Sequence, residues 1–244
     1  MVTGAGSGIG RAIARAFAQA GASVVVADID EAGGAETVEL IHAAGGRALF
    51  QRCDVSRVAE VDALLATALK QTGSLDFAVN NAAVELERTP LTEVPEPIFD
   101  RLMEVNVKGV FLCLQRQLRQ MAQQGHGAIV NIASVNAYRP QYEQCVYTAS
   151  KHAVLGLTRN AALEAAPHGV RINAICPGAI ETPMLEVSLA QTSLSRADVI
   201  DRMSLNGRFG RPEEIAKAAL WLCGDDASFT FGHALAVDGG YLAR

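Results

Sequence analysis

Closely spaced cysteines are missing from this chain of 244 residues. A disulfide-framed secreted domain needs cysteines that are close together and usually even in number. The absence of such a pattern excludes a disulfide scaffold and favours reduced thiols, so we expect a cytoplasmic protein. The cysteines are Cys53, Cys113, Cys145, Cys176 and Cys223, and none stands in a C-x-x-C motif.

Basic charge and long apolar runs are also lacking. The chain has 21 Lys and Arg against 26 Asp and Glu, a net charge of −5 at pH 7. Because the chain has no stripe of basic residues, it does not attract nucleic acid electrostatically. No apolar run approaches the ~20 residues that cross a bilayer, and no signal segment opens the chain. The five histidines lack ligand spacing, so we expect no nucleic-acid partner, no membrane partner and no metal.

Short β-branched runs alternate with helical stretches along the chain. This alternation predicts βαβ units, which form a parallel sheet with helices on both faces and right-handed crossovers. No linker or repeat divides residues 1–244, so one domain is expected. The expected strands are 23–27, 48–52, 75–79, 128–132, 171–175 and 234–237. The expected helices are about 10–19, 31–43, 57–72, 98–123, 148–165 and 212–223.

A Gly-rich turn, TGAGSGIG at 3–10, opens the chain before a helical pattern. Such a turn lets backbone N–H groups and the positive end of a helix approach a pyrophosphate. The next strand, 23–27, ends at Asp28, where a dinucleotide fold places the acid that binds the adenosine ribose. The spacing Gly4-x-x-x-Gly8-x-Gly10 differs from G-x-G-x-x-G, so the prediction depends on turn, strand and acid together.

The first strand is unusual in its length. It should precede the Gly-rich turn, yet only Met1 and Val2 remain of it. This strand would be central in the sheet, and two residues cannot pair fully with both neighbours. We therefore expect a truncated strand with upstream residues missing, the alternative being an unusually short strand.

Tyr147 and Lys151 stand four residues apart in YTASK, a spacing that places them on one face of a helix. A free phenol has a pKa of about 10 and is a poor base near neutrality. A close cation favours the phenolate, so we expect Lys151 to lower the pKa of Tyr147 and suit it for proton exchange. Ser134, which follows strand 128–132, can donate a hydrogen bond to a carbonyl oxygen. An isolated Y-x-x-x-K is common on surface helices, so the pair gains meaning from the other motifs.

Taken together, the motifs resemble those of the short-chain dehydrogenase/reductase family along essentially the whole chain. The residues that carry the resemblance are TGAGSGIG at 3–10, Cys53-Asp54-Val55, Asn80-Asn81-Ala82-Ala83, Asn106 in VNVKGVF, Ser134 in IVNIAS, Tyr147 with Lys151, Cys176-Pro177-Gly178 with Thr182, and Val237-Asp238-Gly239-Gly240. The resemblance implies an α/β, doubly wound, Rossmann-type sheet of seven parallel strands in the order 3-2-1-4-5-6-7. Ala83 departs from the usual NNAG of the family and adds one methyl group near the expected ribose site.

The same resemblance implies four catalytic roles. Tyr147 acts as general acid and base, and Ser134 positions the substrate oxygen. Lys151 supports Tyr147 and holds the nicotinamide ribose. Asn106 kinks its helix and holds a water in a proton relay that reaches Lys151.

The expected cofactor is NAD, lying across the carboxyl ends of the strands. By resemblance, Asp54 accepts the adenine amino group, the Val55 N–H bonds a ring nitrogen, and Thr182 bonds the nicotinamide carboxamide. A helix cap at Ser56 is the simpler explanation for the region of Asp54. The expected cofactor-binding residues are Gly4, Ser7, Gly8, Ile9, Gly10, Asp28, Asp54, Val55, Asn81, Ala82, Tyr147, Lys151, Pro177, Gly178 and Thr182.

The expected activity is an NAD-dependent interconversion of a secondary alcohol and a ketone. An alternative is an NADPH-dependent 3-oxoacyl-carrier-protein reductase-like enzyme, which usually has a basic residue where Ser7 stands and no acid at position 28. A non-catalytic nucleotide-binding regulator is a further alternative, because a fold alone never proves activity. The complete catalytic set disfavours the regulator.

The substrate is expected to lie between a polar wall and a lid. Glu85, Arg139 and Tyr142 can line this wall together with Asn136, Gln141 and Gln144. Because these side chains are polar, a polar ketone, polyol or sugar-like substrate is favoured over a steroid. Segment 184–207 has turn-rich ends and an amphipathic middle, as substrate lids do. Helices 98–123 and 148–165 carry more apolar residues than one stripe needs, and a homotetramer is expected. The expected substrate-binding residues are Ser134, Asn136, Gln141, Gln144 and Tyr147.

Overall fold

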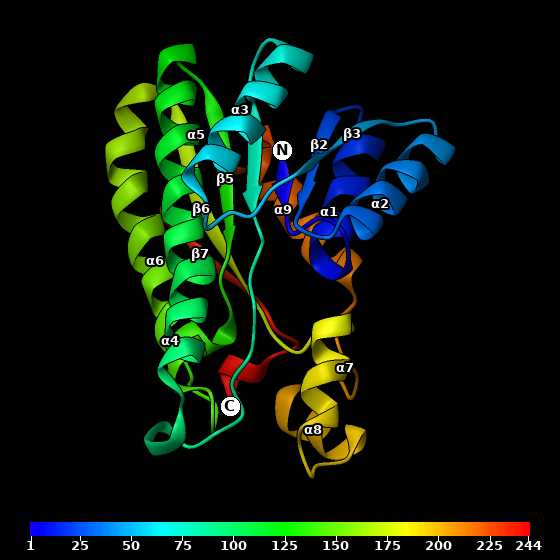
Figure 1. Cartoon of the computed structure of the whole chain (residues 1–244), viewed down its shortest axis with the longest axis vertical. Helices are drawn as coiled ribbons and strands as arrows, with labels where there is room; N and C mark the ends of the chain where they lie inside the picture. Colours follow the sequence, from blue (N-terminus) through cyan, green and yellow to red (C-terminus); the bar gives the residue numbers. More distant parts are fainter.

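The computed structural model describes residues 1–244 and contains one seven-stranded sheet with helices on both faces (Figure 1). The strand order is β3-β2-β1-β4-β5-β6-β7, and every neighbouring pair is parallel. The predicted doubly wound architecture and strand order are therefore confirmed. The strands are β1 (Val2–Thr3), β2 (Ser23–Asp28), β3 (Arg47–Arg52), β4 (Phe77–Asn80), β5 (Gly127–Ile132), β6 (Val170–Pro177) and β7 (Ala234–Val237).

Two helical layers cover the sheet. Helices α1, α2 and α9 pack on one face, and α3, α5 and α6 pack on the other. None of the helices combines the length and the hydropathy that crossing a membrane requires. The helices are α1 (Gly8–Gln19), α2 (Glu31–Ala43), α3 (Val58–Thr72), α4 (Glu96–Met103), α5 (Val110–Gln124), α6 (Cys145–Ala165), α7 (Pro183–Ala190), α8 (Arg196–Met203) and α9 (Pro212–Cys223).

The central strands are apolar because both of their faces are covered. Val24, Val25, Val26 and Ala27 of β2 are all buried, as expected for a strand of a parallel sheet between two helical layers. The layer of α1 and α9 closes over a cluster of 21 buried residues, and the layer of α5 and α6 closes over another of 16. These two cores hold the sheet in place. The residues expected to form the site lie at the carboxyl edge of this sheet.

Strand β1 is two residues long and pairs on both sides. Val2 is in register with Val26 of β2 and with Val79 of β4. Met1 extends the contact, because its ammonium donates to the Phe77 carbonyl at 2.9 Å and its carbonyl accepts the Val79 N–H at 2.9 Å. The strand thus reaches both neighbours, over a shorter length than theirs.

The helix expected over 98–123 is interrupted. A π turn, Glu104–Gly109, joins α4 to α5 and contains Asn106. The expected kink at Asn106 therefore takes the form of a widened turn, a feature that often marks functional sites.

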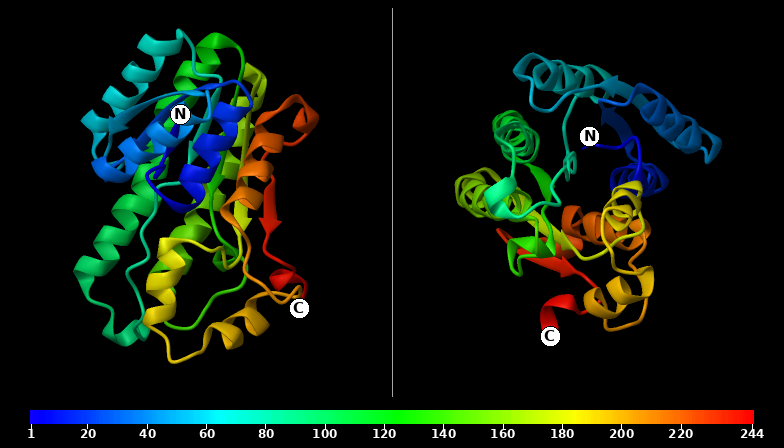
Figure 2. Two further views of the ribbon diagram at one scale, coloured as in Figure 1. Left: turned by 90° about the vertical axis from the view of Figure 1, so that its right-hand side faces the viewer. Right: turned by 60° about the horizontal axis from the view of Figure 1, so that its bottom comes forward.

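Figure 2 shows that α7 and α8 project beyond the carboxyl edge of the sheet, away from the two helical layers. Neither helix has a fully buried residue. These two helices fill most of the predicted lid segment 184–207.

Candidate active site

The residues predicted for the site all gather at one edge of the sheet. The Gly-rich turn follows β1, Asp28 ends β2, and Asp54 follows β3. Asn81 follows β4, Ser134 follows β5, and Gly178 follows β6. Because all the strands are parallel, these positions share the carboxyl edge, where open α/β sheets bind their ligands.

The Gly-rich turn is folded tightly against the start of α1. A Cβ at Gly10 would lie 2.0 Å from the Gly4 carbonyl oxygen, so only glycine fits there. Gly8 has a φ of +49°, and a Cβ on it would lie 3.1 Å from Cγ2 of Thr182. The turn, which contains Ser7 and Ile9, therefore lies against the residue expected to bind the nicotinamide end.

Asp28 is held at this turn by two backbone donors. Its Oδ2 accepts the Gly6 N–H at 2.7 Å and its Oδ1 accepts the Asp30 N–H at 3.0 Å. A carboxylate offers about four acceptor positions, so capacity remains for two ribose hydroxyls. A fixed acid beside a Gly-rich turn at a helix N-terminus fits a dinucleotide.

Asn81 ties the first and fourth strands together at the same edge. Its Nδ2 donates to the carbonyls of Thr3 at 3.0 Å and Gly4 at 2.9 Å. The Thr3 hydroxyl in turn accepts the N–H groups of Asn81 at 3.0 Å and Ala82 at 3.2 Å. Asn81 and Ala82 therefore support the Gly-rich turn from behind.

Asp54 interacts with Ser56 in a way the sequence did not predict. Its Oδ1 accepts the Ser56 N–H at 2.9 Å and the Ser56 hydroxyl at 2.6 Å. Burial alone raises the pKa of Asp54, but these hydrogen bonds and Arg101 outweigh it and lower the pKa. The alternative of Ser56 as a helix cap is wrong, because α3 begins at Val58 with Arg57 in the capping position.

Tyr147, Lys151 and Ser134 are buried together. Tyr147 and Ser134 are each 8% exposed, and Lys151 is 3% exposed. The Lys151 ammonium donates to the Ile132 carbonyl at 3.1 Å and lies 5.5 Å from the centre of the Tyr147 ring. The spacing on α6 thus brings phenol and ammonium onto one face, and β5 brings Ser134 to them.

Contrary to expectation, the pKa of Tyr147 is raised rather than lowered. Burial is the largest cause and the Glu85 carboxylate adds to it, while a hydrogen bond from Ser134 and the charge of Arg88 lower the pKa to a smaller extent. Burial also lowers the pKa of Lys151 to about 8. In this structure, removal from water outweighs the Ser134 hydrogen bond and the Arg88 charge at Tyr147, so both Tyr147 and Lys151 are shifted toward their neutral forms.

Asn106 holds a loop and the catalytic helix together. Its Oδ1 accepts the Val84 N–H at 2.9 Å, and its Nδ2 donates to the Val84 carbonyl at 2.9 Å. The same Nδ2 donates to the Ser150 hydroxyl at 3.2 Å, which donates to the Tyr147 carbonyl at 2.7 Å. Ser150 was missed in the sequence, where a serine inside a helix gives no signal of its own.

The polar wall forms as a hydrogen-bonded row, which we call the amide row: Asn136, Gln141 and Gln144. The Ser134 hydroxyl accepts the Asn136 N–H at 3.1 Å. Asn136 Nδ2 donates to Gln144 Oε1 at 2.8 Å, and Gln141 Nε2 donates to Asn136 Oδ1 at 2.9 Å. The structure therefore joins the predicted substrate residues into one surface next to Ser134.

Two other candidates for the wall point elsewhere. Arg139 donates to the Tyr241 carbonyl at 3.2 Å and stacks 4.8 Å above the Tyr241 ring. Tyr142 is 85% exposed. Neither residue forms part of the amide row.

Glu87 is a functional residue that the sequence did not reveal. Its carboxylate is only 1% exposed and accepts the N–H groups of Val146 at 2.8 Å and Tyr147 at 3.0 Å. It therefore satisfies the free N–H groups at the start of α6, where the helix dipole favours a negative charge. Glu87 is 59 positions away from Val146 and 60 away from Tyr147, so only the fold brings these residues together.

Glu85 and Arg88 form an ion pair beside the amide row. Gln144 donates to the Glu85 carboxylate, and Arg88 donates to the hydroxyl of Ser188 on α7. The pair therefore links the wall of the site to the segment predicted as a lid.

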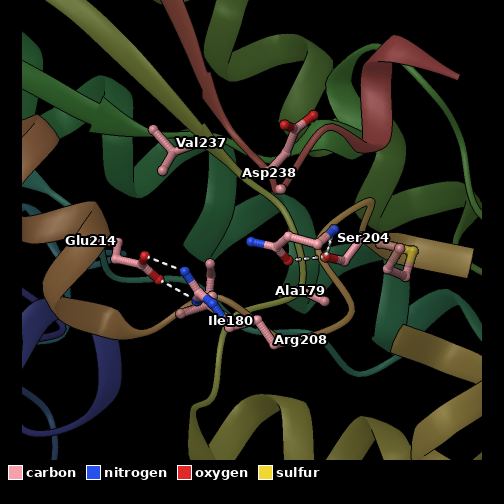
Figure 3. A pocket seen from close by; sticks show the side chains of 11 residues that line it. Ala179, Ile180, Ser204, Arg208, Glu214, Val237 and Asp238 are labelled. Carbon is pink, nitrogen blue, oxygen red and sulfur yellow. Dashed lines mark hydrogen bonds and ion pairs between the residues drawn. The ribbon is translucent and has the colours of Figure 1, made fainter. Parts of the chain in front are cut away.

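The segment 184–207 is anchored at both ends. Thr182 caps α7 by accepting the Leu185 N–H at 3.2 Å. Figure 3 shows the far end, where two Arg208 nitrogens pair with the Glu214 carboxylate at 2.8 and 2.7 Å. Asp238 lies in the same pocket and fixes the turn of the VDGG motif by accepting the Gly240 N–H at 2.9 Å.

His, Cys, Asp and Glu side chains form no cluster of three or more that could hold a metal ion. The free cysteines are distributed over the fold, and all except Cys145 are buried.

Comparison with known proteins gives full-length matches. A family model described as enoyl-(acyl carrier protein) reductase, adh_short_C2, matches residues 4–242. The 2,5-dichloro-2,5-cyclohexadiene-1,4-diol dehydrogenase of Sphingobium indicum is 44% identical, over 100% of this chain and 96% of its own length. The cis-4-hydroxycyclohexanecarboxylate dehydrogenase of Sinomonas cyclohexanicum is 42% identical, over 100% of this chain and 96% of its own length.

Solved structures agree closely with the fold. The crystal structure of levodione reductase superimposes with a TM-score of 0.95 at 38% identity, covering 99% of this chain and 96% of that one. The structure of a 3-ketoacyl-(acyl-carrier-protein) reductase from Brucella melitensis, complexed with NADH, gives a TM-score of 0.90 at 37% identity, covering 98% and 96%.

Proposed function

Because the chain belongs to the short-chain dehydrogenase/reductase family, we propose that it is an NAD-dependent oxidoreductase that interconverts a secondary alcohol and a ketone. The observation that carries the proposal is the burial of Tyr147 and Lys151 together with Ser134 at the carboxyl edge of the sheet. Relatives that are 44% and 42% identical are named as dehydrogenases of a cyclic diol and of a cyclic hydroxy acid, which supports the same reaction class.

The residues of the site divide the reaction among them. In oxidation, Tyr147 accepts the proton of the alcohol hydroxyl, while hydride leaves the carbon that bears this hydroxyl. Ser134 hydrogen-bonds the substrate oxygen, and Lys151 holds the nicotinamide ribose. The bound nicotinamide supplies the acceptor for hydride. In reduction Tyr147, which its raised pKa keeps in the protonated form, returns the proton.

Asn106 has a positioning role in this proposal. Its bonds to Val84 and Ser150 hold the loop after β4 against α6. The water relay to Lys151 that the family resemblance implies is part of the proposal.

NAD is the proposed coenzyme because Asp28 stands where the adenosine ribose binds. A 2′-phosphate would bring about −2 charge toward that carboxylate. At ~4 Å and an effective dielectric of ~20, each unit pair costs about 4 kcal/mol before screening. Even a third of this corresponds to a roughly tenfold preference. Measured kcat/KM should therefore favour NAD over NADP at least tenfold, and equal values would refute the assignment.

The rest of the proposed cofactor site follows the same edge. Gly4, Ser7, Gly8, Ile9 and Gly10 bind the pyrophosphate, and Asp54 with Val55 binds the adenine. Asn81, Ala82, Pro177, Gly178 and Thr182 border the nicotinamide half. The close approach of Gly8 to Thr182 supports this arrangement.

A 3-oxoacyl-carrier-protein reductase is the second candidate. It is favoured by the 37% identity to the Brucella melitensis reductase. The absence of a basic residue at Ser7 and the presence of Asp28 argue against its NADPH form. Turnover of an acetoacetyl thioester with NADPH, at a higher kcat/KM than any secondary alcohol gives with NAD, would favour this candidate.

The proposed assembly is a cytoplasmic homotetramer, with 184–207 as the substrate lid. The apolar residues predicted on α5 and α6 fall into two groups, and Val110, Leu114, Val154 and Leu155 are buried in the chain's own core. Phe111 at 45% and Leu163 at 77% exposure remain on the surface and support an interface. Light scattering tests the assembly, and a mass near 25.7 kDa would refute it.

The central test is an assay of NADH formation with a panel of secondary alcohols and purified protein. Turnover that disappears in Tyr147→Phe supports the proposal. Binding of NAD with no turnover of any alcohol or ketone in the panel would favour the non-catalytic regulator instead.

A further inference from the structure

The Glu85–Arg88 pair has no part in the proposed hydride transfer, yet it lies beside the reacting groups. The side chains are 13% and 19% exposed, so the pair is largely removed from solvent. Both charges act on the Tyr147 phenol, in opposite directions. Gln144, which donates to the Glu85 carboxylate, connects the pair to the wall of the site.

The pair stands at the far end of the amide row from Ser134. The row runs from the Ser134 hydroxyl through Asn136 to Gln144, which donates to the Glu85 carboxylate. On its other side, Arg88 contacts Ser188 of α7. A substrate whose reacting oxygen binds Ser134 and Tyr147 would extend along this row toward Glu85 and Arg88, under α7.

The chemistry of the pair selects among polar groups. A carboxylate only accepts hydrogen bonds and a guanidinium only donates them, whereas a hydroxyl can do both. A neutral hydroxyl can therefore bind Glu85 and Arg88 at once. A carboxylate or sulfonate could bind Arg88 but would lie next to the like charge of Glu85, which is unfavourable.

No further positive charge of the adjoining loop offsets Glu85. Glu87 is the next titratable residue, and its carboxylate is already bound to the start of α6. Lys151 on the other side donates to the Ile132 carbonyl, and its charge also interacts with Glu85. The charges of Arg88 and Lys151 thus match those of Glu85 and Glu87, and this end of the site carries no surplus of positive charge.

We propose that Glu85 and Arg88 form a specificity site for a neutral hydroxyl group at the end of the substrate remote from the reacting carbon. The inference rests on the proposed function and narrows it to cyclic diols or hydroxyketones, in preference to hydroxy acids. The two relatives described above represent these alternatives, since one is named for a cyclohexadiene-1,4-diol and the other for a 4-hydroxycyclohexanecarboxylate.

Three alcohols with the same ring test the proposal: cyclohexane-1,4-diol, cyclohexanol and cis-4-hydroxycyclohexanecarboxylate. With NAD and the wild-type protein, kcat/KM should be about tenfold higher for the diol than for cyclohexanol, the worth of one hydrogen bond to a charged group. The kcat/KM for the carboxylate should be lower than that for cyclohexanol. A kcat/KM for the carboxylate that equals or exceeds that for the diol would overturn the inference.

Two single-charge variants separate recognition from structure. Glu85→Gln should remove the repulsion and raise kcat/KM for the carboxylate relative to the diol at least tenfold. Arg88→Gln should lower the value for the carboxylate further. Glu39→Gln, on the exposed face of α2, is the matched control and should leave all three ratios unchanged. If kcat/KM of the Glu85→Gln variant falls by the same factor for all three alcohols, Glu85 has a structural role only, and the inference is overturned.

Calorimetric binding of the same three compounds to the protein with NADH keeps this test independent of turnover. Selective binding of the diol that is lost in Glu85→Gln supports the specificity site, even where no alcohol is oxidised. Selective binding of the diol without oxidation of any alcohol would refute only the proposed oxidation. Equal binding of all three compounds would refute the specificity site.

Discussion

Helix α6, which carries the proposed catalytic residues, and helices α7 and α8 of the proposed lid are held very differently. In α6, Tyr147, Ser150 and Lys151 are all buried, and the start of the helix is bound by Glu87. In α7 and α8, no residue is fully buried. The groups proposed to carry the chemistry are therefore fixed by the core, as precise catalysis requires. The helices proposed to cover the substrate lack such buried anchors.

The lid is instead held by polar contacts and by its ends. Arg196 of α8 pairs with Glu181 at 2.9 Å and Glu186 at 2.7 Å, and its guanidinium lies 4.8 Å above the Phe209 ring. These ion pairs are exposed, and exposed pairs contribute little stability. Segments of this kind open locally at low free-energy cost.

Removing the phenolic hydroxyl should give the largest effect on the rigid side of the comparison. Tyr147→Phe keeps the packing of the ring and deletes the proton donor, so kcat should fall ~10²–10⁴-fold. NAD affinity and melting temperature should stay close to wild type. A variant that keeps most of the wild-type rate would remove Tyr147 from the mechanism.

Changing the residue that holds α6 should have the next largest effect. Glu87→Gln retains one acceptor but deletes the charge at the helix start, and we expect kcat to fall roughly tenfold with a stability loss of about 1–3 kcal/mol. KM for NADH should not change. In the reduction direction, where Tyr147 must be protonated, the alkaline limb of the kcat–pH profile should move to lower pH as negative charge near Tyr147 is lost.

Glu186→Gln, a change of an exposed lid acid, is the control for Glu87→Gln. It should alter neither kcat nor the pH profile. A stability loss in Glu87→Gln without any change in the pH profile would reduce Glu87 to a structural residue.

The buried ammonium of Lys151 should give a pH-dependent effect on stability. Its pKa falls from 10.5 to about 8 on folding, so between these values the unfolded chain binds more protons. Stability attributable to this group therefore rises with pH from about 8 toward 10.5 and is lowest below 8. Lys151→Met should lose activity, lack this rise and melt higher than wild type at pH 7. Parallel melting curves of both proteins against pH provide the measurement.

The smallest effect concerns the lid itself. Without ligand, amides of 184–207 should exchange with solvent much faster than those of α6, and NADH with a bound ketone should slow the lid amides only. Hydrogen exchange followed by mass spectrometry makes the comparison in one sample. Lid amides that are already protected before ligand is added would show that the two regions do not differ.

Much of the frame could be predicted because local patterns determine it. The strand and helix alternation predicted a parallel sheet between two helical layers, and the family resemblance implied its strand order. The Gly-rich turn and Asp28 placed the expected nucleotide site at one edge of that sheet. The Y-x-x-x-K spacing placed Tyr147 and Lys151 on one helix face. Each of these depends on residues close together in sequence.

What could not be predicted depends on contacts between distant parts of the chain. The pKa of Tyr147 follows from how deeply α6 is packed, which no spacing reveals. Glu87 reaches α6 across about sixty positions, and only the packing shows which apolar residues of α5 and α6 are core, such as Val110, and which stay exposed, such as Leu163. The amide composition of the wall was visible, but its joining into one row was not.

The π turn at Glu104–Gly109 has a consequence for how the chain can vary in length. Each residue of an α-helix turns the next by about 100°, and a π turn absorbs one additional residue. The faces of α4 and α5 are therefore out of phase. Leu102 of α4 packs with Val146 and Tyr147, whereas Met121 of α5 packs into the core beneath the sheet. Deleting a single residue here would rotate one of these faces away from its partner. At this point the number of residues carries structural information of its own, in addition to the identity of Asn106.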